Sequence, residues 1–151
     1  MPPAPAVAAP PAASAAPVIA APDADPLSLA RACANQGLLE EALAACHGAI
    51  AADRTRPAAY FLSATICDEL GRAEDSIAAL GKVLYLDQDF ILAHHALGRL
   101  YKRLGKHKES ARHVAVALEL LSAKGRDEIV PESDGMTCGR LAESVRAMTG
   151  A

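Results

Sequence analysis

The stretch ILAHHALGRLYKRLGKHKESARHVAVALELLSAK, residues 91–124, decides the fold. In its first half, apolar residues recur at the spacing of one helix face, and Gly105 then interrupts the pattern. A glycine at this place supplies the left-handed residue that ends a helix. A second helical pattern follows, from about Lys108 to Leu121. We expect its inward side to hold Ala111, Val114, Ala115 and Leu118.

The same pattern recurs along the chain with a period of 34 residues, carried by Gly37, Gly71 and Gly105. Five residues after each glycine stands a small residue, which allows two helices to approach closely. These small residues are Ala42, Ser76 and Ser110, and Asp53 and Asp87 share a further register. The sequence therefore predicts three helical hairpins over residues 23–124, divided as 23–56, 57–90 and 91–124.

The composition supports an all-α protein and excludes several functional classes. Aromatic residues make up 3% of the 151 residues and tryptophan is absent, which disfavours a β-sandwich or β-barrel. The net charge of −3 argues against a general nucleic-acid binder. No C-x-x-C pair occurs, so the four cysteines are expected to be small buried residues in a reducing compartment. We expect no cofactor and no metal.

The two ends of the chain differ from the repeats. Residues 1–22 are rich in Pro and Ala and lack the basic start of an export signal, so we expect a disordered linker. This tract raises the hypothesis that the chain is the C-terminal piece of a longer protein. Without a long apolar run, the expected location is the cytoplasm, with no membrane insertion.

Residues 125–151 predict a polar loop followed by a capping helix. Thr137 is the expected N-cap, with Met136 and Leu141 forming a hydrophobic staple around it. Leu141, Val145 and Met148 then form an apolar stripe that would cover the last hairpin. Ser133 and Asp134 are interpreted as turn and capping residues.

The helical hairpin with Leu97-Gly98, Tyr101, Gly105 and a small residue near 110–111 resembles the tetratricopeptide repeat. The fold class that this implies is an all-α solenoid of three repeats, closed by a C-terminal capping helix and preceded by the disordered Pro/Ala-rich tail.

Residues 84–149, and above all PESDGMT-x-GRL at 131–141, are similar to the C-terminal repeat region of CheR-type chemoreceptor methyltransferases. In that family a SAM-dependent domain methylates receptor glutamates, and the repeats dock or regulate. This chain has no counterpart of that domain, so we carry over no catalytic residue and expect no enzyme activity of the chain by itself.

The resemblance implies a docking module of a bacterial chemosensory system, associated with receptor methylation. The expected partner is a chemoreceptor, a kinase or the methyltransferase catalytic domain. Two alternatives stay open: a fragment or subunit of a protein-glutamate methyltransferase, and a generic repeat scaffold or chaperone.

In tetratricopeptide arrays the first helix of each hairpin lines a concave groove, which would bind the partner. The residues that this register assigns to the groove are Arg31, Asn35, Thr65, Asp68, Glu69, His95, Arg99 and Lys102. Basic side chains dominate its last part, because residues 91–124 carry 7 basic and 2 acidic side chains. We expect a groove for an acidic or mixed-charge peptide; the alternative is an ordinary solvated helix face.

Three other sites are disfavoured. A clamp for a terminal carboxylate needs polar residues at five positions, and four of the five are apolar in this register, which has Leu27, Arg31, Leu62, Leu92 and Ala96 there. His94 and His95 point about 100° apart on a helix and cannot chelate one ion. Cys138 at a helix start could have a lowered pKa, although a packing role is favoured.

Overall fold

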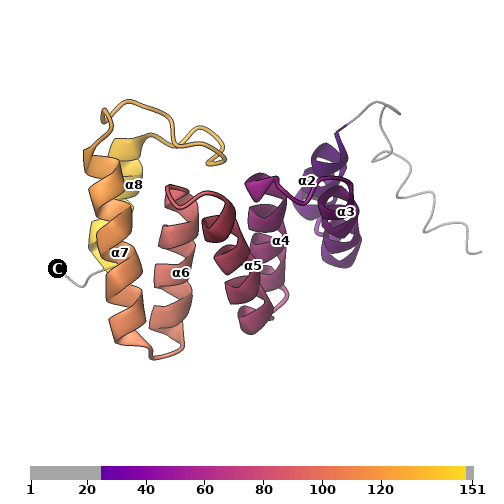
Figure 1. Ribbon diagram of the computed structural model, residues 1–151, viewed down its shortest axis with the longest axis horizontal. Coiled ribbons are helices and arrows are strands. Elements are labelled where there is room, and N and C mark those ends of the chain that lie inside the picture. Colours follow the sequence, from indigo (N-terminus) through magenta and orange to yellow (C-terminus); the bar gives the residue numbers. More distant parts are fainter. Residues whose placement is uncertain (1–24, 149–151) are drawn as a thin grey trace, which may run out of the picture. The chain divides into compact units, whose positions relative to one another are not determined.

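The computed structural model describes residues 25–148, which form seven α-helices and no β-strand (Figure 1). The chain divides into two compact units, Met1–Arg54 and Thr55–Ala151. The first unit holds α2 (Pro26–Asn35) and α3 (Leu39–Ala52). The second holds α4 (Pro57–Glu69), α5 (Ala73–Leu86), α6 (Ile91–Arg103), α7 (His107–Ser122) and α8 (Cys138–Met148). The predicted all-α hairpin fold is confirmed, whereas the expected linker, residues 1–22, lies outside the described residues.

The first helix of every hairpin ends in the same turn. Gly37, Gly71 and Gly105 have φ angles of 80°, 81° and 79°, in the left-handed region that only glycine adopts readily. The residue after each glycine donates its N–H back across the turn to a carbonyl of the last helical turn. These bonds are Leu38 to Cys33 at 2.9 Å, Arg72 to Cys67 at 2.8 Å and Lys106 to Tyr101 at 2.8 Å. The predicted helix-ending glycine is thus confirmed in all three hairpins as a Schellman motif.

The small residues after each glycine lie where the two helices of a hairpin touch. Ser76 and Ser110 are buried, and each hydroxyl donates to a carbonyl of the facing helix. The Ser76 Oγ lies 2.8 Å from the Ala64 carbonyl, and the Ser110 Oγ lies 2.7 Å from the Gly98 carbonyl. Their hydroxyls are therefore satisfied inside the contact, which is the condition for burying a polar group there.

The last hairpin is closed by α8, as the sequence predicted. Thr137 caps this helix, since its Oγ1 accepts the Arg140 N–H at 3.3 Å. Leu141 and Val145 are buried against a core cluster that includes Val114 and Leu121 of α7. Each such fully buried side chain contributes about 1.5–3 kcal/mol to stability.

One detail of the predicted packing is wrong. Ala111 and Ala115 are exposed, and the buried face of α7 instead consists of Ser110, Val114, Ala117 and Leu121. The hydroxyl contact of Ser110 with α6 fixes the rotation of α7 about its axis. Alanine is small enough to be tolerated on either face, so it gave a misleading inward signal.

The connection from α7 to α8 folds back on itself. Val130 donates its N–H to Met136 O at 2.9 Å, and Cys138 donates to Glu128 O at 2.7 Å. Val130 is buried at the base of this hairpin-like loop, whereas Glu132 and Asp134 at its tip have φ angles of 64° and 58°. The loop is therefore a built element rather than a simple polar linker.

None of the helices within residues 25–148 combines the length and the apolar run that crossing a bilayer requires.

Helices α6 and α7 pack closely at Gly98. A Cβ at this position would lie 2.9 Å from Val114 Cγ2, and β-branched Val114 has little rotamer freedom in a helix. Overpacking costs about 1–3 kcal/mol, whereas a glycine-to-alanine change in a helix gains about 1 kcal/mol. We expect Gly98→Ala to lower the free energy of unfolding by about 1 kcal/mol in urea titrations.

The matched control is Gly81→Ala in α5, where nothing lies within 4 Å of the added Cβ. It should raise the free energy of unfolding by about 0.5–1 kcal/mol. Equal stabilisation by both substitutions would contradict the close packing at Gly98.

Candidate functional site

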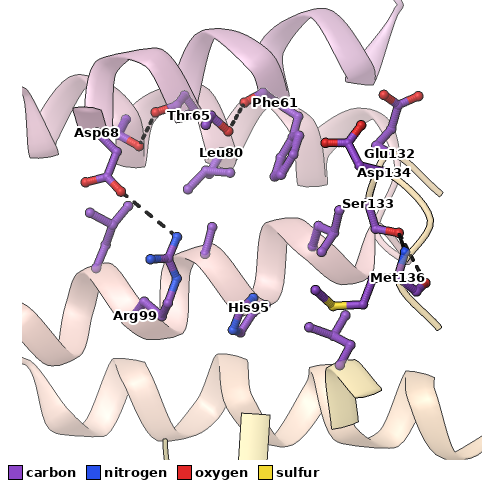
Figure 2. Close-up of a pocket in the computed structure, with 16 residues that line it drawn as sticks. Phe61, Thr65, Asp68, Leu80, His95, Arg99, Glu132, Ser133, Asp134 and Met136 are labelled. Carbon is purple, nitrogen blue, oxygen red and sulfur yellow. Dashed lines mark hydrogen bonds and ion pairs between the residues drawn. The ribbon is translucent and has the colours of Figure 1, made fainter. Parts of the chain in front are cut away.

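A pocket of about 260 Å³ lies in the second unit, and Figure 2 shows the side chains around it. Helices α4 and α6 supply most of its lining, with further residues from α5, the α7–α8 loop and α8. Much of the lining is apolar, including Ala64, Leu80, Ala96 and Leu100. The first helices of two consecutive hairpins thus face a common cavity.

Four of the sequence-predicted groove residues meet at this pocket: Thr65, Asp68, His95 and Arg99. Lys102 is engaged elsewhere, because its Nζ donates to Met148 O at 2.6 Å and so stabilises the carboxyl end of α8. Glu69 is exposed at the end of α4 and does not line the pocket. Arg31 and Asn35 lie on α2, in the first unit.

Asp68 organises the charge at one end of the pocket. Its carboxylate lies 2.6 Å from Arg103 Nη2 and 4.0 Å from Arg99 Nη2. The mutual repulsion of Arg99 and Arg103 on α6 is therefore relieved by Asp68 of α4. Arg99 holds the weaker of the two contacts, and its side chain is 48% exposed.

The α7–α8 loop forms a wall that sequence reasoning missed. Glu132, Ser133, Asp134 and Met136 all line the pocket. The Ser133 hydroxyl donates to Val130 O at 2.6 Å and accepts the Met136 N–H at 3.0 Å, which holds the tip in shape. Its predicted turn role is correct, but its place beside α4 was not foreseen. The sequence signal for this wall was the length of the connection. The connection from α7 to α8 spans residues 123–137, whereas the connection from α5 to α6 spans only residues 87–90.

His95 is the polar residue of the pocket whose hydrogen bonding is incomplete. Its Nε2 is buried and has no hydrogen-bond partner. Burial, followed by the charge of Arg99, lowers the pKa of His95 to about 4, so the ring is neutral at pH 7. An unsatisfied buried polar atom costs about 1–3 kcal/mol.

His94 has a structural role instead. It is buried, and its Nε2–H donates to Gln88 O at 2.9 Å. Its Nδ1 lies 3.2 Å from the Nδ1 of His113, whose ring stacks on Tyr101. Burial chiefly, with the nearby charges of His94 and Arg112, lowers the pKa of His113. Across the described part of the chain, no group of three His, Cys, Asp or Glu side chains is placed to hold a metal ion.

All four cysteines are free and buried, as expected from the sequence: Cys33, Cys46, Cys67 and Cys138. Burial, assisted by Glu128, raises the pKa of the Cys138 thiol. The alternative of a lowered pKa at the start of α8 is therefore wrong, and this thiol packs rather than reacts.

Two hairpins stacked with their first helices on a shared cavity, each reversed at a left-handed glycine, define a helical-hairpin repeat protein. Residues 34–100 match the model of the tetratricopeptide repeat family. No curated protein matches the chain. The fold is the tetratricopeptide helical-hairpin fold, which protein-interaction scaffolds use.

Solved structures agree with this fold. The MamA fragment 41-end from Desulfovibrio magneticus RS-1 is 26% identical, with a TM-score of 0.61 over 64% of this chain and 54% of that chain. The chain thus spans about half the length of that MamA structure. The type III secretion translocator chaperone SycD of Yersinia enterocolitica is 15% identical, with a TM-score of 0.71 over 83% of this chain and 85% of that chain.

A third similar structure is the first tetratricopeptide domain of Spaghetti (RPAP3), bound to the HSP90 peptide SRMEEVD. It is 16% identical, with a TM-score of 0.60 over 81% of this chain and 88% of that chain.

The unsatisfied His95 Nε2 leads to a stability test. An apolar ring removes the buried polar atom while keeping the shape, so we expect His95→Phe to raise the free energy of unfolding by about 1 kcal/mol at pH 7. Differential scanning calorimetry measures this, with His107→Phe at the exposed start of α7 as control. An unchanged or lower stability of His95→Phe would contradict the cost assigned to Nε2.

The same histidine leads to a pH test. Its folded pKa of about 4 lies below the ordinary value near 6.5, so the unfolded chain takes up the proton first as the pH falls. The contribution of this titration to the free energy of unfolding is therefore fully kept above about pH 6.5 and is lost as the pH falls towards 4. Between these values the stability of His95→Phe should fall less steeply than that of the wild type. Parallel pH profiles would contradict the lowered pKa.

Proposed function

We propose that this chain is a non-catalytic docking module whose second unit binds a segment of a partner protein in the pocket. The observation that carries the proposal is the cavity itself, with an apolar interior between charged side chains. A bound peptide in the similar RPAP3 structure supports a peptide as the class of ligand.

The pocket chemistry favours an internal segment of the partner over its terminal carboxylate. Leu92 and Ala96, at two positions where a carboxylate clamp needs polar side chains, line the pocket. Such residues bind apolar side chains and offer nothing to a terminal carboxylate.

We further propose that the partner belongs to a bacterial chemosensory methylation system. The support is the segment PESDGMT at 131–137, which carries the narrower family resemblance and supplies four pocket residues. A chemoreceptor, a kinase and the methyltransferase catalytic domain are the three partners to test, and the cytoplasm is the proposed location. A generic scaffold or chaperone remains the second candidate, since MamA and SycD share the fold.

We propose, in addition, that the three repeats are residues 23–56, 57–90 and 91–124, followed by a capping segment at 125–151. The helix bounds support this division, because α4 and α6 begin and end 34 residues apart. Arg31 and Asn35 stay sequence predictions of partner contacts made by the first repeat.

A substitution that fills the pocket tests the docking proposal. Thr65 is exposed and lines the pocket, so Thr65→Arg places a long charged side chain in the cavity with little effect on the core. We expect affinity for the partner to fall at least about tenfold, which corresponds to about 1.4 kcal/mol. Calorimetric titration against each of the three purified candidate partners measures it.

The control is Ala78→Arg, at another exposed site, on α5 and outside the pocket, with circular dichroism confirming that both variants fold. Equal affinity of the two variants would contradict docking in the pocket. Binding of none of the three candidates would contradict the chemosensory assignment.

Incubating the purified chain with chemoreceptor and methyl-labelled SAM tests the non-catalytic role. We expect no label on the receptor until a methyltransferase catalytic domain is added. Methyl transfer by the chain alone would overturn the proposal in favour of a catalytic subunit.

A further inference from the structure

We propose that the pocket selects a dipolar peptide segment, in which one apolar side chain lies between a cationic residue and a carboxylate residue. This inference rests on the proposed docking function and specifies the chemistry of its ligand.

The end of the pocket formed by the α7–α8 loop is acidic. Glu132 and Asp134 are exposed, line the pocket and appear at the same end of it as Phe61 of α4 (Figure 2). Both adopt left-handed backbone conformations, and the Ser133 hydroxyl ties the intervening turn to Val130 and Met136. Asp134 presents its carboxylate here on a preformed turn, which suits a cationic side chain of the ligand.

The opposite end carries a net positive charge. Asp68 is bound closely by Arg103 at 2.6 Å, so one positive charge is compensated there. Arg99 contributes the second, holds Asp68 only at 4.0 Å and is half-exposed. A guanidinium in this position can turn to a ligand carboxylate and bind it through two parallel hydrogen bonds.

The separation of the ends sets the spacing of the ligand. Phe61 lies at the acidic end and Asp68 at the basic end, and their separation of seven positions along α4 corresponds to about 10 Å of helix. An extended peptide advances about 3.3 Å per residue, so about three residues separate the two charged side chains.

The interior between the ends accepts an apolar side chain. Leu80, Leu100 and Met136 line it, and its volume of about 260 Å³ lies at the lower limit of pockets that hold small molecules. A single leucine or methionine side chain is thus the fitting anchor, and an all-charged or bulky folded ligand is not.

Selection from a random decapeptide library displayed on phage tests the inference, with the purified full chain as bait and Thr65→Arg as background. We expect enriched peptides to carry Lys or Arg and Asp or Glu about three residues apart, with Leu or Met between them. The most enriched peptide is then synthesised with a fluorescent label and titrated by anisotropy.

Two variants remove one charge each from the protein. Asp134→Asn keeps a residue that tolerates the left-handed backbone, and Arg99→Gln leaves the Arg103–Asp68 ion pair intact. Each substitution should lower the affinity for the synthetic peptide about 2- to 5-fold, as expected for loss of an exposed ion pair. The controls, Asp127→Asn and Arg112→Gln, lie outside the pocket and should leave affinity unchanged.

The outcomes separate the two proposals. Pocket-dependent peptides without the paired charges, or affinities unchanged in Asp134→Asn and Arg99→Gln, overturn the dipolar ligand but leave pocket docking standing. Absence of pocket-dependent enrichment also overturns the dipolar ligand, and the Thr65→Arg titration with whole partners then decides the docking function alone.

Discussion

The left-handed turn that ends each first helix is the constraint on which the rest of the structure depends. Gly37, Gly71 and Gly105 adopt almost the same φ angle, and each turn is closed by the same backward hydrogen bond. A residue with a Cβ is strained in this conformation, so glycine fixes where the chain reverses. Because the reversal recurs every 34 residues, α4 and α6 present equivalent faces. The pocket is a consequence of that equivalence.

Close packing within each hairpin fixes how its two helices are oriented, and so fixes the geometry of the pocket. The hydroxyls of Ser76 and Ser110 bond to carbonyls of the facing helix twelve residues earlier, which fixes the two helices in rotation as well as in distance. Gly98 removes the side chain that would otherwise hold α6 and α7 apart. With the rotation of α6 set on its packed side, His95 and Arg99 are left on the side that faces α4. The packed face of the helix thus positions the face that lines the pocket.

The features predicted correctly from the sequence are those fixed by local spacing: the period, the helix-ending glycines, the small contact residues and the Thr137 cap. The features missed depend on pairs far apart in the chain. Lys102 is bonded to Met148, 46 residues away, and Asp68 pairs with Arg103, 35 residues away. No periodic pattern encodes such pairings. The exposure of Ala111 and Ala115 was missed for another reason, because alanine fits either side of a helix.

The protonation chemistry of the pocket fits the recognition role proposed for it. A general base works best with a pKa near the working pH, whereas burial and Arg99 hold the pKa of His95 at about 4. The ring is thus neutral but a poor proton acceptor at pH 7. Asp68 is held by Arg103, and Cys138, which does not line this pocket, is buried with a raised pKa. These groups offer hydrogen bonds and charge in fixed places, which is the chemistry that the proposed peptide docking requires.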